Sequence, residues 1–373
     1  DRMNFENKTR KIGCKKATAL TIVLMTAAVS GCLSSESEND NSLVIVTYDV
    51  YALSDEMIST FENRTGIEVE MVKLADSGSI LSYLIQQKGT GANDLAIGLD
   101  NTYLQTAIDF DLLSESKTDI QGISSAAYSP YEGKLAIPFD MGHICLNYDS
   151  SIVDGVNLSV PTSLWNLTEE EWKGKVALPS PMSSSPGRGF MLATLDYFEY
   201  TTDSYHGFDT WWSSMRDNDV IITPGWSEAY EIHYTGGYGE YMPGYIGDAH
   251  ITVSYCHSPG VEAWYNGNWT KSASLNLDRA SFFQVEYASV VQGGNAENAD
   301  LFIEYLLSPE VNALMPTQNM MYSVLEGQDL PEEGGYRHHS IVPDQNANIT
   351  SMAISLNIDA WLDRWNSAMT EGE

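Results

Sequence analysis

Residues 43–74, LVIVTYDVYALSDEMISTFENRTGIEVEMVKL, carry the pattern that decides the fold. The run Leu43–Tyr48 is apolar and rich in β-branched residues, which is typical of a strand buried on both faces of a parallel sheet. Ser54 is a favourable helix N-cap, apolar residues follow at helical spacing, and Gly66 ends the helix. Ile67–Leu74 alternates apolar and polar residues and predicts a second strand. The stretch therefore predicts a strand–helix–strand unit of an open α/β sheet.

The same alternation of strands and helices continues along the chain. Further helices are expected at Ile80–Gln87, Phe190–Phe198 and Ala296–Leu307. Further strands are expected at Asp94–Leu99, Ala136–Pro138, Ile144–Tyr148, Val220–Thr223, Ile251–Tyr255 and Phe283–Val291. A chain of 373 residues is long enough for two α/β lobes, and small ligands bind in clefts between domains. We expect lobe 1 at 43–142, lobe 2 at 143–281, and a return to lobe 1 with C-terminal helices at 282–373.

The first 31 residues have the pattern of a secretory signal peptide. Six basic residues precede the apolar run Ala17–Val29, whose thirteen residues are too few to span roughly 30 Å of hydrocarbon. The run ends in small residues before Cys32, which resembles the lipobox of exported lipoproteins, where the cysteine receives the lipid. An uncleaved membrane anchor is the alternative, and both interpretations place the rest of the chain outside the cytoplasm. Residues 32–42 then predict a flexible, lipid-anchored tether on the outer face of the membrane.

The charge balance limits the possible partners. The chain has 51 acidic and 19 basic residues, a formal net charge of −32. Such a surface repels phosphate backbones, which excludes nucleic acid as an expected partner. The HExxH, paired CxxC and Walker patterns are absent from the sequence, and we expect no metal and no catalytic residue.

Three segments carry candidate binding chemistry, and each follows a strand or opens a helix. The Ser183–Gly189 segment (SSSPGRG) could present free backbone N–H groups to an anion, or it could be an ordinary capped helix start. The segment Gly225–Tyr230 (GWSEAY) places Trp226 at a turn, either for packing or for a ligand. Ser254–Pro259 (SYCHSP) lies at a strand's carboxyl end, where open α/β sheets bind ligands. Rings and hydroxyls in such places suit a flat, cationic, partly polar ligand.

Together these segments and several others resemble, in the family's order, the thiamine-binding proteins of ABC importers. The similarity runs from about Leu43 to the end of the chain. The segments that carry it are Thr47–Asp49, Gly98–Asn101, Pro138–Gly142, Ser184–Gly187, Gly225–Tyr230, Ser254–Tyr255, Gln284–Glu286 and Pro316–Thr317, with Trp361 and Trp365 near the C-terminus. The resemblance implies a two-lobed α/β protein of the type II periplasmic-binding fold. It would close over thiamine, or its mono- or diphosphate, and deliver it as a monomer to a membrane permease and its ATPase subunits, with no further cofactor.

The resemblance also implies roles for individual residues. Trp226 and Tyr255 would lie against the thiamine rings, with Tyr48 nearby. Asp76, beside Ser77, would offer a carboxylate to the cationic or polar part of the ligand. The other expected ligand-binding residues are Ser184 and Ser185 at the hydroxyethyl or phosphate end, and Cys256, His257 and Ser258 in the wall begun by Tyr255.

The chain departs from the family pattern at several positions. Met320 stands where the family has a tryptophan, Val261 where an aromatic residue is usual, and Ser77 where the family has a glycine. A long insertion at residues 236–247 (GGYGEYMPGYIG) offers tyrosines in place of the missing rings. These changes leave the preferred phosphorylation state of the ligand open.

Two alternative functions remain on the sequence alone. A thiaminase-like enzyme of the same fold would use a cysteine nucleophile, and Cys256 beside His257 is the candidate. Cys145 is expected to be a small buried hydrophobic residue, although the compartment also permits a disulfide between the two cysteines. The second alternative is a ferric-ion or polyamine receptor of the same superfamily. The pair His338 and His339 is its tempting iron ligand, but it lies in a Gly- and Glu-rich loop and is expected to be solvated.

Overall fold

A computed structural model describes residues 41–49, 53–119, 121–201 and 207–370. The predicted signal peptide at 1–31, the predicted lipid attachment at Cys32 and nearly all of the predicted tether lie outside these residues. In the part of the chain that the structure describes, no helix combines the length and apolarity needed to cross a membrane.

The opening unit forms as its sequence pattern predicts. It consists of β1 (Ser42–Tyr48), α1 (Asp55–Thr65) and β2 (Glu68–Leu74), and the two strands pair in parallel. The Ser54 hydroxyl accepts a hydrogen bond from the Met57 N–H at 3.2 Å, which caps the first turn of α1. Gly66 ends the helix at φ 75°, a left-handed conformation that favours glycine.

The other elements continue the α/β alternation. The remaining strands are β3 (Leu95–Asp100), β4 (Leu113–Ser114), β5 (Ile137–Asp149), β6 (Val176–Pro179), β7 (Ile221–Thr223), β8 (Ile251–Tyr255), β9 (Ser272–Ser274), β10 (Phe282–Val291) and β11 (Tyr322–Ser323). The remaining α-helices are α2 (Ser77–Gln87), α3 (Leu104–Asp109), α4 (Ser125–Tyr128), α5 (Ser185–Thr201), α6 (Gly207–Asp217), α7 (Ser258–Tyr265), α8 (Ala296–Leu307), α9 (Pro309–Asn312), α10 (Tyr336–His339) and α11 (Ser351–Thr370). Within the described residues the strands form one eleven-stranded sheet with the main order β2-β1-β3-β10-β5-β8-β6-β7.

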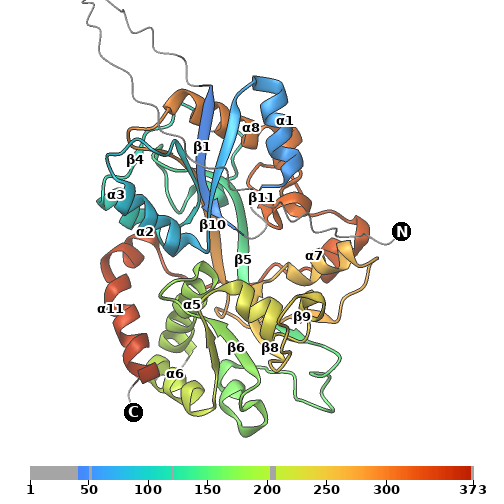
Figure 1. Cartoon of the computed structure of the whole chain (residues 1–373). Coiled ribbons are helices and arrows are strands. Elements are labelled where there is room, and N and C mark those ends of the chain that lie inside the picture. The colour runs from blue at the N-terminus through green and yellow to red at the C-terminus, as the bar shows by residue number, and fades with distance from the viewer. Residues whose placement is uncertain (1–40, 50–52, 120, 202–206, 371–373) are drawn as a thin grey trace, which may run out of the picture. The chain divides into compact units, whose positions relative to one another are not determined.

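The sheet is covered by separate apolar cores at its two ends. At the β2-β1-β3 end, Leu43 and Ile45 pack with α1 and α8, whereas Val46 points to the opposite face with α2 and α3. Figure 1 shows these helices on either side of β1. At the β8-β6-β7 end, a third core joins the strands to α5, α6 and α11, and Trp365 of α11 packs against Trp212 of α6. Separate cores at the two ends of one sheet, two at the first end and one at the second, are the signature of two lobes.

Two long strands contribute residues to cores at both ends of the sheet. In β5, Phe139 lies in the first core and Ile144 in the third, and in β10 the corresponding residues are Val290 and Phe282. These antiparallel strands pair with each other from Ile137 to Ile144 of β5. They are therefore the continuous connection between the lobes.

The structure corrects three predicted element boundaries. The strands expected at Ala136–Pro138 and Ile144–Tyr148 are one strand, β5, because pairing with β10 continues through the residues between them. Helix α2 begins at Ser77 rather than Ile80, because Asp76 supplies its N-cap. Helix α5 begins at Ser185 rather than Phe190, so the Ser-Pro-Gly segment is its first turn.

Candidate functional site

The predicted ligand-binding residues lie at or after the carboxyl ends of strands. Strands β1 and β2 are parallel, as are β6, β7 and β8, so each group of strand ends lies on one edge of the sheet. These edges are where open α/β sheets bind ligands. Tyr48 and Tyr255 are the last residues of β1 and β8. The residues that follow a strand are Asp76 and Ser77 (β2), Ser184 and Ser185 (β6), Trp226 (β7), and Cys256, His257 and Ser258 (β8).

Asp76 joins the two groups of strand ends. Its Oδ1 accepts hydrogen bonds from the backbone N–H of Ser77 at 2.7 Å and from that of Ser185 at 3.0 Å. The Ser185 hydroxyl in turn donates to the Ser77 hydroxyl at 2.7 Å. The carboxylate therefore caps its own helix, α2, and the N-terminus of α5 in the other lobe, where helices favour negative charge. Burial raises the pKa of Asp76 to about 7, against the lowering effect of these backbone hydrogen bonds.

This contact bears on the two interpretations of the serine-rich segment, an anion site for the ligand or an ordinary capped helix start. In the structure the N–H of Ser185 at the start of α5 donates to the protein's own carboxylate, Asp76. Ser184 is fully buried, and its hydroxyl accepts a long hydrogen bond from Gly187 N–H at 3.4 Å. The assignment of Ser184 and Ser185 to the ligand stays a prediction.

The aromatic side chains of the site are held in place by specific contacts. The Trp226 Nε1–H donates to the Ser254 hydroxyl at 2.9 Å, and its ring stacks on Tyr230 with centroids 4.8 Å apart. Tyr48 lies against Gly98, where a Cβ would come within 2.4 Å of the Tyr48 ring. Gly98 also has φ 100°, so this approach requires glycine. Rings held in this way offer a pre-organised surface to a flat ligand.

Cys256 and His257 are both bonded to other residues of the protein. The Cys256 sulfur forms a disulfide with Cys145, and both residues are buried. His257 Nε2–H donates to the Met320 carbonyl at 2.6 Å, and burial lowers the pKa of its ring to about 4. The hydroxyl of Ser258 accepts from Tyr255 N–H at 3.2 Å. Without a free thiol, Cys256 cannot be the nucleophile that the thiaminase-like alternative requires.

A row of carboxylates beside Tyr48 was not predicted from the sequence. Glu286 of β10 pairs in register with Asp100 of β3 on one side and with Asp140 of β5 on the other. We call these three residues the carboxylate row; they are 5 %, 0 % and 0 % exposed, respectively. The Tyr48 hydroxyl donates to Glu286 Oε2 at 2.9 Å, which places the row next to a predicted ligand-binding ring. The available signal was an acidic residue inside an apolar strand, as in FFQVEYASVV for β10.

One buried cation accompanies these acids. Arg188 of α5 places its guanidinium carbon 3.7 Å from the ring centroid of Tyr103, a residue of lobe 1. Its Nε–H donates to the Pro181 carbonyl at 3.1 Å. The charge of Arg188 favours the ionised form of Asp100, although burial is the larger effect and raises the pKa of that carboxyl.

The tyrosines of the 236–247 insertion do not all reach the site. Tyr238 donates to Glu231 at 2.7 Å and its ring lies 5.9 Å from that of Tyr230. Tyr241 is 81 % exposed. The insertion therefore supports Tyr230, on which Trp226 stacks, rather than supplying a layer of new rings.

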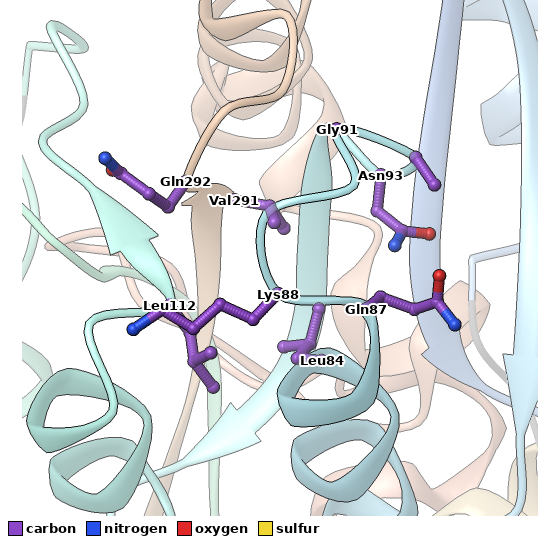
Figure 2. Close-up of a pocket in the computed structure, with 9 residues that line it drawn as sticks. Leu84, Gln87, Lys88, Gly91, Asn93, Leu112, Val291 and Gln292 are labelled. Atoms are coloured by element: carbon purple, nitrogen blue, oxygen red, sulfur yellow. The ribbon is translucent and has the colours of Figure 1, made fainter.

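A pocket elsewhere in lobe 1 contains none of the predicted ligand-binding residues. Figure 2 shows its lining, in which Lys88 and Gln292 surround the apolar side chains of Leu84, Leu112 and Val291. The Lys88 ammonium donates to the Phe110 carbonyl at 2.6 Å, so the cation is already engaged. This pocket is not the candidate site.

Metal binding has no support in the described residues. Among them, no group of three or more His, Cys, Asp or Glu side chains has a geometry that could hold a metal ion. The ring centroids of His338 and His339 lie 4.8 Å apart, without further ligands of this kind. Among the described residues, the two histidines of the ferric-ion alternative therefore belong to no cluster of His, Cys, Asp and Glu that could hold the ion.

Comparison with known proteins identifies relatives of this chain and agrees with its fold. The chain is 25 % identical over 336 residues to the thiamine-binding periplasmic protein of Salmonella typhimurium, covering 88 % of this chain and 93 % of the relative. The thiamine-binding periplasmic protein of Escherichia coli matches with the same identity and coverage. A solved structure titled periplasmic thiamin binding protein superposes with a TM-score of 0.73 at 24 % identity, covering 88 % of this chain and 96 % of the other.

These comparisons confirm the predicted fold and the predicted resemblance. The fold is the two-lobed type II periplasmic-binding fold, with β5 and β10 shared between the lobes. A model of the family described as bacterial extracellular solute-binding protein matches residues 93–346, more than half of the chain. The chain therefore belongs to the family of bacterial extracellular solute-binding proteins.

Proposed function

We propose that this protein is an extracytoplasmic receptor that binds thiamine and delivers it to an ABC importer. The observation that carries the proposal is the juxtaposition of Tyr48 and Tyr255 with buried carboxyls that have no ion-pair partner among the described residues. Aromatic faces and negative charge in a buried place suit a flat organic cation. Thiamine is such a cation, and the two relatives that are named for binding thiamine match 88 % of this chain.

The ligand is tested by calorimetry with thiamine, spermidine and Fe(III) in parallel. We expect saturable binding of thiamine and no competition by the other two. Native mass spectrometry of the freshly purified protein should show retained vitamin. Tighter binding of spermidine or iron than of thiamine would refute the proposal.

We further propose that the protein acts as a monomer, has no catalytic activity and is anchored by a lipid on Cys32. The disulfide at Cys256 supports the absence of catalysis, because it removes the candidate nucleophile. Incubation with thiamine and a nucleophilic co-substrate should return intact thiamine. Mass spectrometry of the membrane-extracted protein should show an acylated N-terminal peptide beginning at Cys32, and a Cys32→Ala variant should lose it.

The two serines at the start of α5 give a prediction about phosphorylated ligands. In the double variant Ser184→Ala/Ser185→Ala, we expect thiamine phosphates to lose more affinity than thiamine. A phosphate that reaches this helix N-terminus has to displace Asp76 from the Ser185 N–H. The hydroxyls of Ser184 and Ser185 would then donate hydrogen bonds to the phosphate and so offset the loss of the Asp76 contact. Calorimetric titration with thiamine and its monophosphate measures the difference. Equal losses for both ligands would mean that the serines only cap the helix.

A further inference from the structure

The carboxylate row concentrates more negative charge than its surroundings neutralise. Side chains directly opposite each other on neighbouring strands have Cβ atoms about 4.5–5.5 Å apart, and like charges in this arrangement repel. Glu286 has such a neighbour on both sides, Asp100 and Asp140. No ion pair of the described residues includes a member of the row. Three buried carboxylates cannot all be ionised here without a compensating positive charge.

The groups that face the row come from every element packed around it. Tyr48 donates its hydroxyl to Glu286, and Gln284 donates its amide to both Asp100 Oδ2 and Glu286 Oε1 at 3.1 Å. The other titratable or charged groups that act on the row are Asp76 before α2, Tyr103 before α3, Tyr255 of β8, Tyr287 of β10 and Arg188 of α5. Apart from Arg188, none of these side chains carries a positive charge, so they do not neutralise the row.

Two buried oxygen atoms, one in the row and one beside it, lack a hydrogen-bond donor within the described part of the chain. They are Oδ1 of Asp140 and Oε1 of Gln284, both in residues that are fully buried. The other Asp140 oxygen accepts from the amide of Asn319 at 2.5 Å, so that side chain is held in its position. A buried acceptor without a donor is costly, and a positive charge placed nearby offsets part of that cost by electrostatic attraction rather than by a hydrogen bond.

We propose that the carboxylate row selects a cationic ring over a neutral ring of the same shape, and that the cation enters the site with release of a proton. This inference rests on the proposed binding of thiamine, whose thiazolium ring is a permanent cation. The proton leaves a carboxyl of the row for solvent, and the ligand's charge takes its place. The net charge of the site is unchanged and no covalent bond forms.

The direction of the pH dependence follows from the burial of the row. Burial raises the pKa of the Asp140 and Glu286 carboxyls above their ordinary values, and the charge of Asp140 raises that of Glu286 further. The unliganded site therefore holds a proton. A bound cation favours the ionised form and lowers these pKa values. Affinity therefore rises with pH between the lowered pKa of the complex and the raised pKa of the free protein, and it falls as the pH drops through this interval.

The first test measures proton release by the unmodified protein. Calorimetric titration with thiamine at neutral pH, in buffers of different ionisation enthalpy, should report the release of about one proton per ligand. A neutral thiamine analogue, in which a thiophene ring replaces the thiazolium, should bind at least about tenfold more weakly and release none.

The second test uses Glu286→Gln, which keeps the shape of the side chain and removes its charge. We expect thiamine to bind at least about tenfold more weakly, the neutral analogue to change by less than about threefold, and proton release to disappear. The matched control is Asp300→Asn. Asp300 is a buried carboxylate of lobe 1 outside the row, bonded to Ser116 and to Lys117 N–H. Its replacement should change neither the affinity nor the proton count.

The outcomes separate this inference from the proposed function. Absence of thiamine binding would overturn the proposed function itself. Tight binding of thiamine without proton release, or with equal affinity for the neutral analogue, would overturn only the inference. Proton release that persists in Glu286→Gln but vanishes in Asp76→Asn would assign the proton to Asp76 and also refute it. Because the first test uses unmodified protein, the inference can be refuted even if Glu286→Gln does not fold.

Discussion

The double variant Cys145→Ser/Cys256→Ser is expected to lose about 2–5 kcal/mol of unfolding free energy. The disulfide joins residues 111 positions apart, and closing so long a loop restricts the unfolded chain strongly. Both residues are buried, so the serine hydroxyls would also lose their contact with water. Guanidinium unfolding should show a lower midpoint and a steeper slope, because the unfolded chain without the bond is less compact and exposes more surface.

The control for this variant is the wild-type protein unfolded in the presence of a reductant. Reduction removes the same bond without a substitution, so its midpoint should fall toward that of the double variant. Equal midpoints for the oxidised wild type and the double variant would show that the bond contributes nothing measurable. The expected loss also matters for the site, because the bond holds the residue after Tyr255 to the shared strand β5.

Trp226→Ala is expected to weaken thiamine binding more than about tenfold. A ring stacked against a cationic ligand contributes about 0.5–2 kcal/mol, and about 1.4 kcal/mol corresponds to a factor of ten. The substitution also removes the support that Trp226 gives to Tyr230, on which it stacks, and the hydrogen bond to Ser254. Both effects act in the same direction, and calorimetric titration measures their sum.

Two further variants separate these contributions. Trp226→Phe keeps an aromatic face and loses the hydrogen bond to Ser254, so it should retain most of the affinity. Trp269→Ala removes a tryptophan that is 59 % exposed and should leave the dissociation constant unchanged. An unchanged dissociation constant in Trp226→Ala would remove Trp226 from the site.

The sequence predicted helices and strands correctly where residues within the segment itself set the boundary. Ser54 and Gly66 mark the true ends of α1, and Ala296–Leu307 is helix α8 without a change of boundary. The errors occur where a distant partner decides the boundary. Strand β5 continues through residues 139–143 because β10 pairs with it there. The sequence of residues 139–143 does not indicate this pairing.

The candidate site was predictable to a similar extent. Strand ends, helix starts and aromatic turns indicated Ser185, Trp226 and Tyr255, whereas Tyr48 and Asp76 followed only from the resemblance to the thiamine-binding proteins. The structure places all five at or after the carboxyl ends of strands. The carboxylate row was missed because each acid stands alone in its own strand. Only the pairing of β3, β10 and β5 shows that three such positions are neighbours.

The sequence by itself determined the α/β alternation, the caps of the helices and the turns that carry the site. Each of these depends on residues a few positions apart, whose propensities and hydrogen bonds act within one segment. Only the tertiary structure decided that Asp76 caps a helix of the other lobe, that Cys145 and Cys256 are bonded, and that Glu286 stands between two acids. These contacts depend on strand register and on chain crossings between distant segments, which side-chain packing of the whole molecule selects.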